Sequence, residues 1–282
     1  FRAEIRASIA HCNGLFRAGA VTRPEAERLK NGLWTILKRA DFDRNYFDNT
    51  DSADIYAFVE GRLFQLINEA AKALEIGRSR PHRAAVALRL WLRDEIEIII
   101  ESLENLIQIL QSLPNYRVFA AFAESFKRDN ERLQEISLRT NQMPCPTFEP
   151  SDEATAEIDF ELIAHELGFG KVLENPIDSA NDRDFCVEFA GAASLLGLHL
   201  SNLANTVLNK FEMDESNRQS LETLRGKCVK TFGHQTILLS LLKGLPIEGA
   251  NELDEVCEIV FDAADTLKFC LPATVAALEK LA

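Results

Sequence analysis

Apolar residues recur every three or four positions along most of the chain, a spacing that predicts amphipathic helices rather than strands. The clearest run covers residues 84–113, which we expect to form one uninterrupted helix roughly 45 Å long at about 1.5 Å per residue. Its apolar face is made by Leu88, Trp91, Leu92, Ile96, Ile99, Leu103, Leu106, Ile107 and Leu110. Pro114 is expected to stop this helix.

Further helical runs share this spacing, and they cover about 118–140, 182–210, 217–243 and 252–281. Asn181 or Asp182 is expected to open the second of these runs, and Pro272 to kink the last. Helices of this length exceed the globular average of about 11–12 residues, so they must bury one another along their length. The pattern therefore predicts an all-α fold, with a long central helical bundle at 84–282 and a smaller helical domain at 1–83.

Shorter helices are predicted nearer the N-terminus. Thr22 and Glu25 have the spacing of a capping box, and Pro24 suits a first helical turn. Asp51 or Ser52 is the expected cap of the helix that follows.

The charge of the chain argues against nucleic acids and membranes as its partners. The chain has 282 residues and a formal net charge of −13. An acidic surface repels phosphate backbones, which argues against nucleic-acid binding. Charges interrupt the apolar runs before they reach about 18 residues, so no membrane-spanning helix is predicted. No basic amphipathic stretch indicates binding to a membrane surface.

The six cysteines contain no CxxC pair, and several lie in amphipathic runs where cysteine packs as a small apolar residue. We therefore expect reduced thiols and a cytoplasmic protein without a signal peptide. The histidines show no metal-ligand spacing, and neither a metal nor another cofactor is expected.

One stretch of the sequence, GRSRPHRAAVALRLWLRDEI at residues 77–96, resembles the argininosuccinate lyase family of the fumarase/aspartase superfamily, where it typically begins G-R-S-R-N-D-Q. Similar segments occur in the same order as in the family: EIRASIAH (4–11), ELGFGKVLENPIDSANDRDFCVEF (166–189), SLETLRGKCVKTFG (220–233), LLSLLKGLP (238–246) and VFDAADTL (260–267). The ordered set covers most of the chain.

This resemblance implies an all-α subunit whose bundle joins three others in a twenty-helix core, with each active site built from three chains. It implies a β-elimination that splits argininosuccinate into fumarate and arginine, a step of arginine biosynthesis. It also implies a small C-terminal domain after the last core helix, and we expect this domain to be absent after Ala282.

The segments that carry the family's chemistry depart from its pattern. The family's catalytic serine lies on a G-S-S-x-M-P-x-K-x-N-P loop just before the SLETLRGK segment. Here the nearby serines are Ser216 and Ser220, for which helix capping or surface polarity is the simpler interpretation. The histidine of a T-H-L-Q segment, which should follow Pro114 and Tyr116, is missing from the sequence.

Substitutions also fall within segments of unchanged length. Pro81, His82 and Arg83 replace the family's N-D-Q, and the proline side chain offers no hydrogen bond. Gly249 stands where the family has a tyrosine, Asn251 and Cys257 where it has lysines, and Asp254 where it has a glutamine. Together these losses predict a degenerate member that has lost its catalytic segments, and no catalytic residue is assigned.

Polar residues of the family pattern that remain form a predicted residual anion- or substrate-binding set: Arg78, Ser79, Arg80, Asp178 and Arg183. The simpler interpretation of Arg80 and Arg183 is that they pair with local carboxylates or helix ends.

Three hypotheses for function follow. In the first, the chain is a non-catalytic scaffold or partner subunit. In the second, it is an active lyase that cleaves argininosuccinate, or a related N-succinyl compound, with its arginines and His82 as recognition groups. In the third, it joins a homologous lyase in a hetero-oligomer, and the partner supplies the missing site segments. The expected assembly is a homotetramer or such a hetero-oligomer.

Overall fold

The computed structural model describes residues 1–48, 50–113, 116–146, 157–246 and 253–280, and it confirms the predicted all-α class. Within those ranges the only strands are β1 (Gln142–Met143) and β2 (Lys171–Val172), which pair in parallel. The chain divides into two compact units, Phe1–Trp91 with Asn141–Asp182, and Leu92–Thr140 with Arg183–Ala282.

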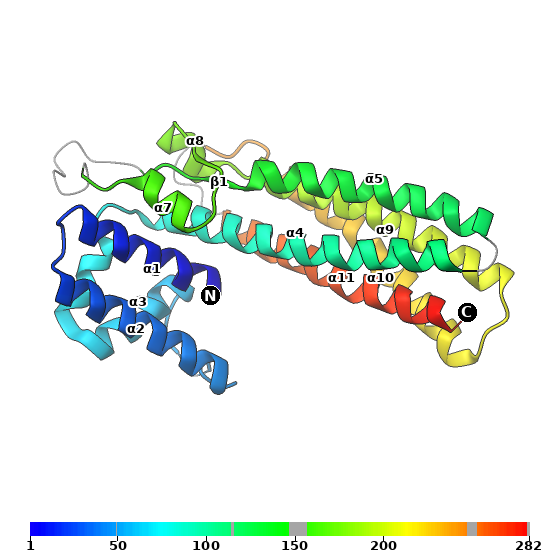
Figure 1. Cartoon of the computed structure of the whole chain (residues 1–282), viewed down its shortest axis with the longest axis horizontal. Helices are drawn as coiled ribbons and strands as arrows, with labels where there is room; N and C mark the ends of the chain where they lie inside the picture. Colours follow the sequence, from blue (N-terminus) through cyan, green and yellow to red (C-terminus); the bar gives the residue numbers. More distant parts are fainter. Residues whose placement is uncertain (49, 114–115, 147–156, 247–252, 281–282) are drawn as a thin grey trace. The chain divides into compact units, whose positions relative to one another are not determined.

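The first unit is built mostly from short helices (Figure 1). They are α1 (Arg2–Arg17), α2 (Arg23–Phe42), α3 (Ile55–Ile67), the 3-10 helix η1 (Asn68–Glu75), α7 (Phe160–Glu166) and α8 (Pro176–Asn181). Two apolar clusters share α1: Ala7 packs in the cluster that holds Phe160, while Ile5 and Cys12 belong to the cluster that holds Leu33. Because α1 is covered on two faces, its buried polar side chains Glu4, Ser8 and His11 must find partners inside the unit.

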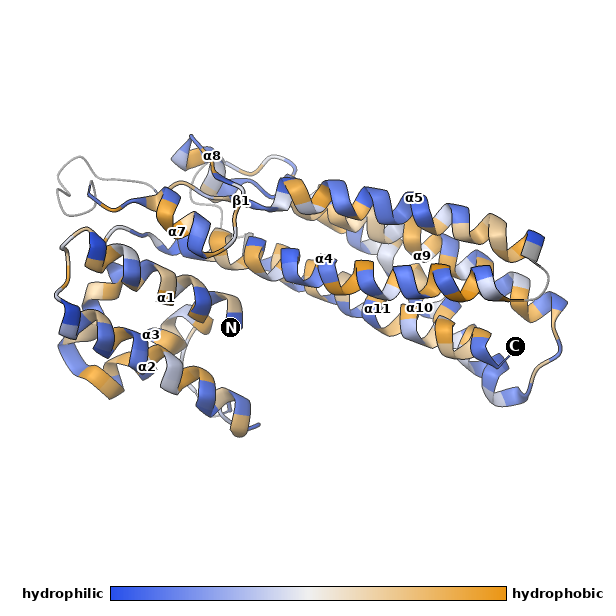
Figure 2. Cartoon of the chain, viewed as in Figure 1, coloured by the Kyte–Doolittle hydropathy of each residue, from blue (hydrophilic) through white to orange (hydrophobic). Residues whose placement is uncertain are grey.

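The second unit is a bundle of long helices that run side by side in Figure 1. They are α4 (Arg80–Ser112), whose residues 80–91 belong to the first unit, α5 (Tyr116–Thr140), α9 (Asp184–Lys210), α10 (Glu215–Leu242) and α11 (Leu253–Glu279). Helix α9 packs against α5, α10 and α11. Figure 2 shows hydrophilic and hydrophobic bands alternating along these helices, as the three-four spacing predicts.

The predicted start of α4 and the predicted cap of α9 differ from the observed ones. Helix α4 begins at Arg80, earlier than the expected residue 84. Pro81 fits in the first helical turn, because backbone N–H groups there have no acceptor within the helix and the N–H that proline lacks is not needed. Helix α9 begins at Asp184 with Arg183 at the N-cap position, so neither Asn181 nor Asp182 caps it.

The predicted cap of α2 is confirmed, and that of α3 is wrong. The Glu25 carboxylate accepts the backbone N–H of Thr22 (2.7 Å) and the Thr22 hydroxyl (2.6 Å), and these bonds lower the pKa of Glu25. Helix α3 is capped by Asp54, which accepts the N–H groups of Tyr56 (2.8 Å) and Ala57 (2.9 Å).

The division of the sequence into 1–83 and 84–282 stays a prediction. In the structure, residues 141–182 return to the first unit, although the sequence pattern assigned them to the bundle. Pro114, the expected helix stop, lies outside the described residues. None of the described helices is long and apolar enough to cross a membrane.

Candidate functional site

The turn before α4 brings the predicted anion-binding residues to the start of a helix. Gly77 has φ +72°, a left-handed conformation that a glycine adopts without steric cost. Ser79 then acts as the helix cap: its hydroxyl accepts the N–H of His82 (3.4 Å), and its carbonyl accepts the N–H of Arg83 (3.0 Å). Ser79 therefore satisfies the α4 terminus from within the chain.

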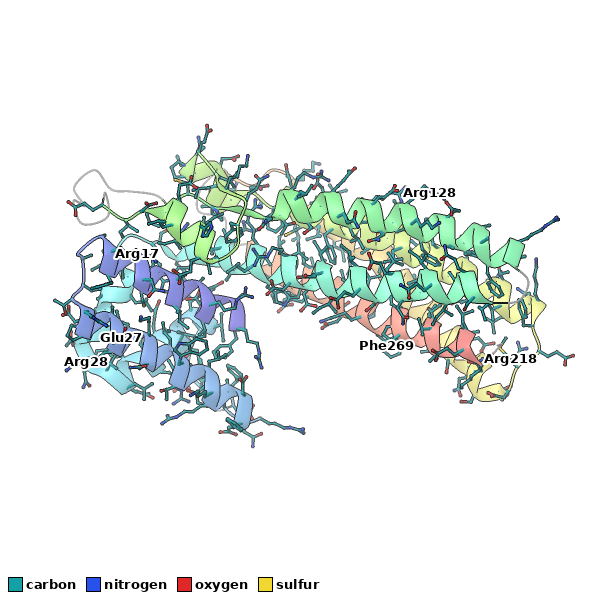
Figure 3. All side chains as sticks on the ribbon, in the orientation of Figure 1. Arg17, Glu27, Arg28, Arg128, Arg218 and Phe269 are labelled. Carbon is teal, nitrogen blue, oxygen red and sulfur yellow. The ribbon has the colours of Figure 1, made fainter. Side chains whose placement is uncertain are left out.

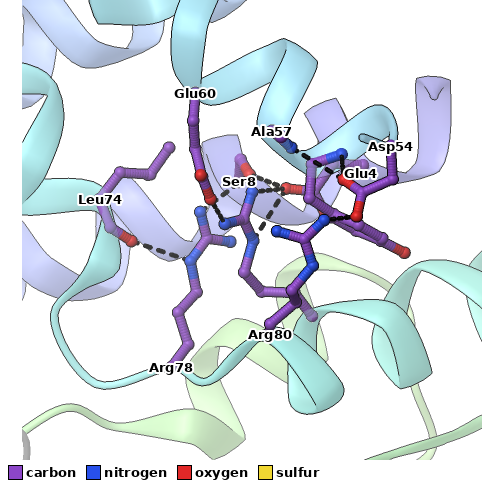
Figure 4. A network of polar contacts seen from close by, with 10 residues as sticks. Glu4, Ser8, Asp54, Ala57, Glu60, Leu74, Arg78 and Arg80 are labelled. Carbon is purple, nitrogen blue, oxygen red and sulfur yellow. Dashed lines mark hydrogen bonds and ion pairs between the residues drawn. The ribbon is translucent and has the colours of Figure 1, made fainter. Parts of the chain in front are cut away.

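Arg83 belongs to a buried polar network within the first unit. Its partners Glu4 and Glu60 are labelled in Figure 4. Its Nε (3.2 Å) and Nη2 (2.7 Å) donate to Oε1 of Glu4 on α1, and its Nη1 donates to Oε1 of Glu60 on α3. Ser8 adds a third hydrogen bond to Glu4 (2.9 Å). Burial by itself would lower the pKa of Arg83, but the attraction of Glu4 and Glu60 outweighs it and raises that pKa.

Arg80, predicted to bind an anion, forms an ion pair with the Asp54 carboxylate. This is the local pairing that the simpler interpretation of Arg80 expects. The guanidinium carbons of Arg80 and Arg83 each lie 5.3 Å from the centre of the Tyr56 ring, within the range of a cation–π contact. Asp54 thus caps α3 and holds Arg80 at once, and α3 is joined to the first turns of α4.

Arg78 faces the same unit and contacts neutral groups. It donates from Nε to the Leu74 carbonyl (2.9 Å) and from Nη2 to the Ser8 hydroxyl (3.0 Å). Burial lowers the pKa of Arg78 to about 10, so the guanidinium stays charged at neutral pH. Ser8 therefore links Arg78 to Glu4, and both arginines converge on α1.

Two buried histidines line a small cavity beside Arg78. The Nε2 of His11 lies 2.7 Å from the Ile76 carbonyl, and the Nε2 of His82 lies 3.1 Å from the Pro144 carbonyl. A carbonyl only accepts, so each Nε2 carries the proton and each neutral ring has a bare Nδ1. Burial lowers the pKa of His82 to about 4 and that of His11 well below its usual value.

The cavity between these rings is too small for a carboxylate ligand. It measures about 20 Å³, which is room for about one water molecule. Its other walls include Met143, Phe160 and Ile163. His82 and Arg83 are thus folded into the interior of the unit while Pro81 is exposed, and His82 cannot act there as a recognition group without repacking.

The remaining predicted residues do not join this cluster. Asp178 is exposed in the first turn of α8 and makes no ion pair with Arg78 or Arg80 in the described part of the first unit. Arg183 belongs to the second unit, where it is buried and its carbonyl accepts the N–H of Cys186. The anion-binding role of the five predicted residues stays a prediction.

Ser216 and Ser220, the serines near the missing loop, have structural surroundings and no catalytic ones in the part of the chain that the structure describes. The Ser220 hydroxyl donates to the Ser216 carbonyl one turn earlier in α10 (2.9 Å). Asp214 caps this helix by accepting the N–H of Asn217 (2.7 Å). Gly249 and Asn251 lie outside the described residues. No group of three or more His, Cys, Asp or Glu side chains in the described ranges is arranged to hold a metal ion.

The network residues that sequence reasoning missed are Glu4 and Glu60. Glu4 lies between Ala3 and Ile5, on a helix whose apolar residues face the core, and its side chain is 1% exposed. A carboxylate at such a position requires a cation inside the fold. That signal was present in the sequence, although it does not identify Arg83 among the candidate cations.

Comparison with known proteins identifies the family of the chain. An argininosuccinate lyase of Pelotomaculum thermopropionicum is 34% identical over an alignment of 311 positions, which covers 96% of this chain and 67% of the relative. The argininosuccinate lyase of Moorella thermoacetica matches to the same extent, also at 34% identity. The chain belongs to the argininosuccinate lyase family. No model in a scan of protein families matches it.

Solved structures support the fold of this argininosuccinate lyase family member. A fumarate lyase from Mesorhizobium sp. BNC1 superposes with a TM-score of 0.80 at 17% identity, covering 98% of this chain and 71% of the other. EDDS lyase in complex with formate superposes with a TM-score of 0.75 at 19% identity, covering 96% of this chain and 62% of the other. At these identities the likeness concerns the fold alone.

The alignment also shows that the family relative contains internal residues that this chain lacks. It runs over 311 positions and covers 96% of the 282 residues of this chain, about 271, so about 40 positions of the Pelotomaculum thermopropionicum protein face gaps. This agrees with the shortened segments found in the sequence.

Proposed function

We propose that this family member has lost catalytic segments and serves as a non-catalytic scaffold or partner subunit. The observation that carries the proposal is the position of Arg83, which replaces part of the family's N-D-Q and is held between Glu4 and Glu60. A side chain committed to two internal carboxylates is not available to a substrate.

The assembly we propose is a homotetramer, or a hetero-oligomer with a homologous lyase. Large apolar side chains are exposed on the bundle helices: Leu195, Leu198, Val229, Phe232, Ile237, Leu239, Phe261 and Phe269. Phe269 is labelled on α11 in Figure 3 and is 48% exposed. Exposed apolar side chains spread over several helices of one unit support burial against other subunits. The free thiols of all six cysteines are consistent with a cytoplasmic setting.

The alternative is an active lyase that cleaves argininosuccinate, or a related N-succinyl compound, into fumarate and an amine. The ion pair of Arg80 with Asp54 is at the surface of the unit, and such pairs contribute only about 0–1 kcal/mol, so Arg80 can exchange its partner for an anion. This is the feature that favours the alternative.

Fumarate release separates the two functions. The full chain is incubated with argininosuccinate and ultraviolet absorbance of fumarate is followed, with the Moorella thermoacetica relative as the positive control. We expect no release above the uncatalysed rate. Release by the wild-type chain that is lost in Arg80→Ala would overturn the non-catalytic proposal and establish the alternative.

A further inference from the structure

Two cysteine thiols meet inside the helical bundle. Cys228 on α10 and Cys270 on α11 have their Sγ atoms 4.0 Å apart, and the two residues are 1% and 0% exposed. A disulfide has an S–S distance of about 2.05 Å, so the two sulfurs must approach by about 2 Å to become bonded. We propose that this pair is a redox-modification site, where a peroxide oxidises the thiols to a disulfide that joins α10 to α11.

The backbone near Cys270 is less constrained than that near Cys228. Pro272 lies inside α11 and has no N–H for the carbonyl one turn before it, so the helix lacks a hydrogen bond at this point. On the other side, α9 approaches α10 closely, because a Cβ on Gly197 would lie 2.6 Å from Oγ1 of Thr231 and 3.4 Å from the Cys228 carbonyl. Close packing with α9 thus restrains α10 beside Cys228, and the missing hydrogen bond at Pro272 is a point where α11 can adjust to bring the sulfurs together.

The two thiols differ in reactivity. The S–H of Cys228 donates to the sulfur of Cys270, and this bond lowers the pKa of Cys270, helped by the charge of Lys227. The same bond and burial raise the pKa of Cys228. Because the thiolate is the nucleophile, Cys270 reacts first and Cys228 resolves the intermediate.

The chemistry balances with hydrogen peroxide as the oxidant. The Cys270 thiolate attacks one peroxide oxygen, the O–O bond breaks, and a sulfenic acid and hydroxide form. The hydroxide takes the Cys228 proton, and the new thiolate attacks the Cys270 sulfur. The S–S bond forms, the S–O bond breaks, and the second hydroxide takes the proton that Cys270 released when it ionised. Two thiols thus lose two electrons, and one peroxide becomes two waters.

Burial makes this oxidation slow and dependent on local opening. Peroxide reaches Cys270 only when the packing around the cysteine pair opens briefly, which is a local event and does not require global unfolding. Once formed, the bond closes a loop from residue 228 to residue 270 and restricts the unfolded chain, so the thermal midpoint of the bundle rises.

The test is a thiol count on the full chain after exposure to hydrogen peroxide. Excess peroxide is removed, the protein is denatured without reductant, and free thiols are titrated. We expect a loss of two of the six thiols, a peptide that links Cys228 to Cys270 in mass spectrometry, and recovery with dithiothreitol. Cys12→Ser is the matched control, because burial raises the pKa of Cys12 to about 12 and its loss leaves the bridge intact.

Three results would overturn the proposal. They are six free thiols after oxidation, a bridge between other cysteines, or a bridge that persists in Cys270→Ala. Circular dichroism verifies the fold of that variant, and if it does not fold, the peptide map of the wild-type chain decides alone.

Discussion

At the scale of single residues, the two carboxylates around Arg83 determine what this side chain does. Arg83 is 5% exposed and Glu4 is 1% exposed, so neither charge is compensated by water. Removing one partner of such a pair leaves the other charge buried and alone, which costs about 3–5 kcal/mol. The network around Arg83 therefore stabilises the fold of the first unit.

Arg83→Met should lower the free energy of unfolding of the first unit by about 3–5 kcal/mol in a urea titration followed by circular dichroism. Arg39→Met, at an exposed site on α2, should change it by less than about 0.5 kcal/mol. Adding Glu4→Gln to Arg83→Met should recover part of the loss, because the orphaned charge is then removed. Equal effects of the two single variants would contradict the network.

His82 gives this unit a dependence on pH. Its pKa is about 4 in the folded chain and 6.5 when unfolded, so between these values the unfolded chain binds the extra proton. Stability is therefore complete above pH 6.5 and falls as the pH drops towards 4, by about 3 kcal/mol for this group.

The difference between wild type and His82→Gln isolates this contribution. The glutamine amide keeps a donor for the Pro144 carbonyl and does not titrate. Urea midpoints measured at intervals from pH 7 to pH 4 should fall less in His82→Gln than in wild type. Parallel profiles would show that the His82 ring is already hydrated or charged in the folded chain.

At the scale of elements, side-chain caps mark the start of several helices, among them α3 and α10. Asp54 accepts two N–H groups at the start of α3 and pairs with Arg80, so Asp54→Ala should cost about 1–2 kcal/mol of stability. Asp51→Ala is the matched control, since Asp51 is exposed and lies outside α3, and it should be close to neutral. Thermal midpoints of both variants decide, and a larger loss in Asp51→Ala would contradict the assignment.

The sequence could predict features that depend on residues close together in the chain, and not those that depend on residues far apart in it. The cap at Thr22 and the long helices depend on residues three or four apart, so the local pattern was sufficient. Asp54 was missed because Asp51 and Ser52 offer the same chemistry within a few positions. The role of Arg83 was missed because its partners are 79 and 23 residues away, a pairing that only the fold reveals.

At the scale of the whole molecule, the exposed apolar side chains of the bundle set an expectation for assembly. Val229→Asp combined with Leu239→Asp places charge on two α10 positions that are 62% and 54% exposed, and the mass in light scattering should fall. Phe42→Asp, at a 90% exposed position of the first unit, should leave that mass unchanged. A monomeric wild-type chain would contradict the assembly itself.

The return of residues 141–182 to the first unit has a consequence for synthesis. When residue 91 leaves the ribosome, His82 still lacks the Pro144 carbonyl, and the cluster around α1 lacks Phe160 and Ile163. The nascent first unit therefore cannot complete its core until α5 and residues 141–182 have been translated. A fragment cut after Trp91 is therefore expected to expose apolar surface and bind chaperones, whereas one that extends to Asp182 contains every residue of the unit.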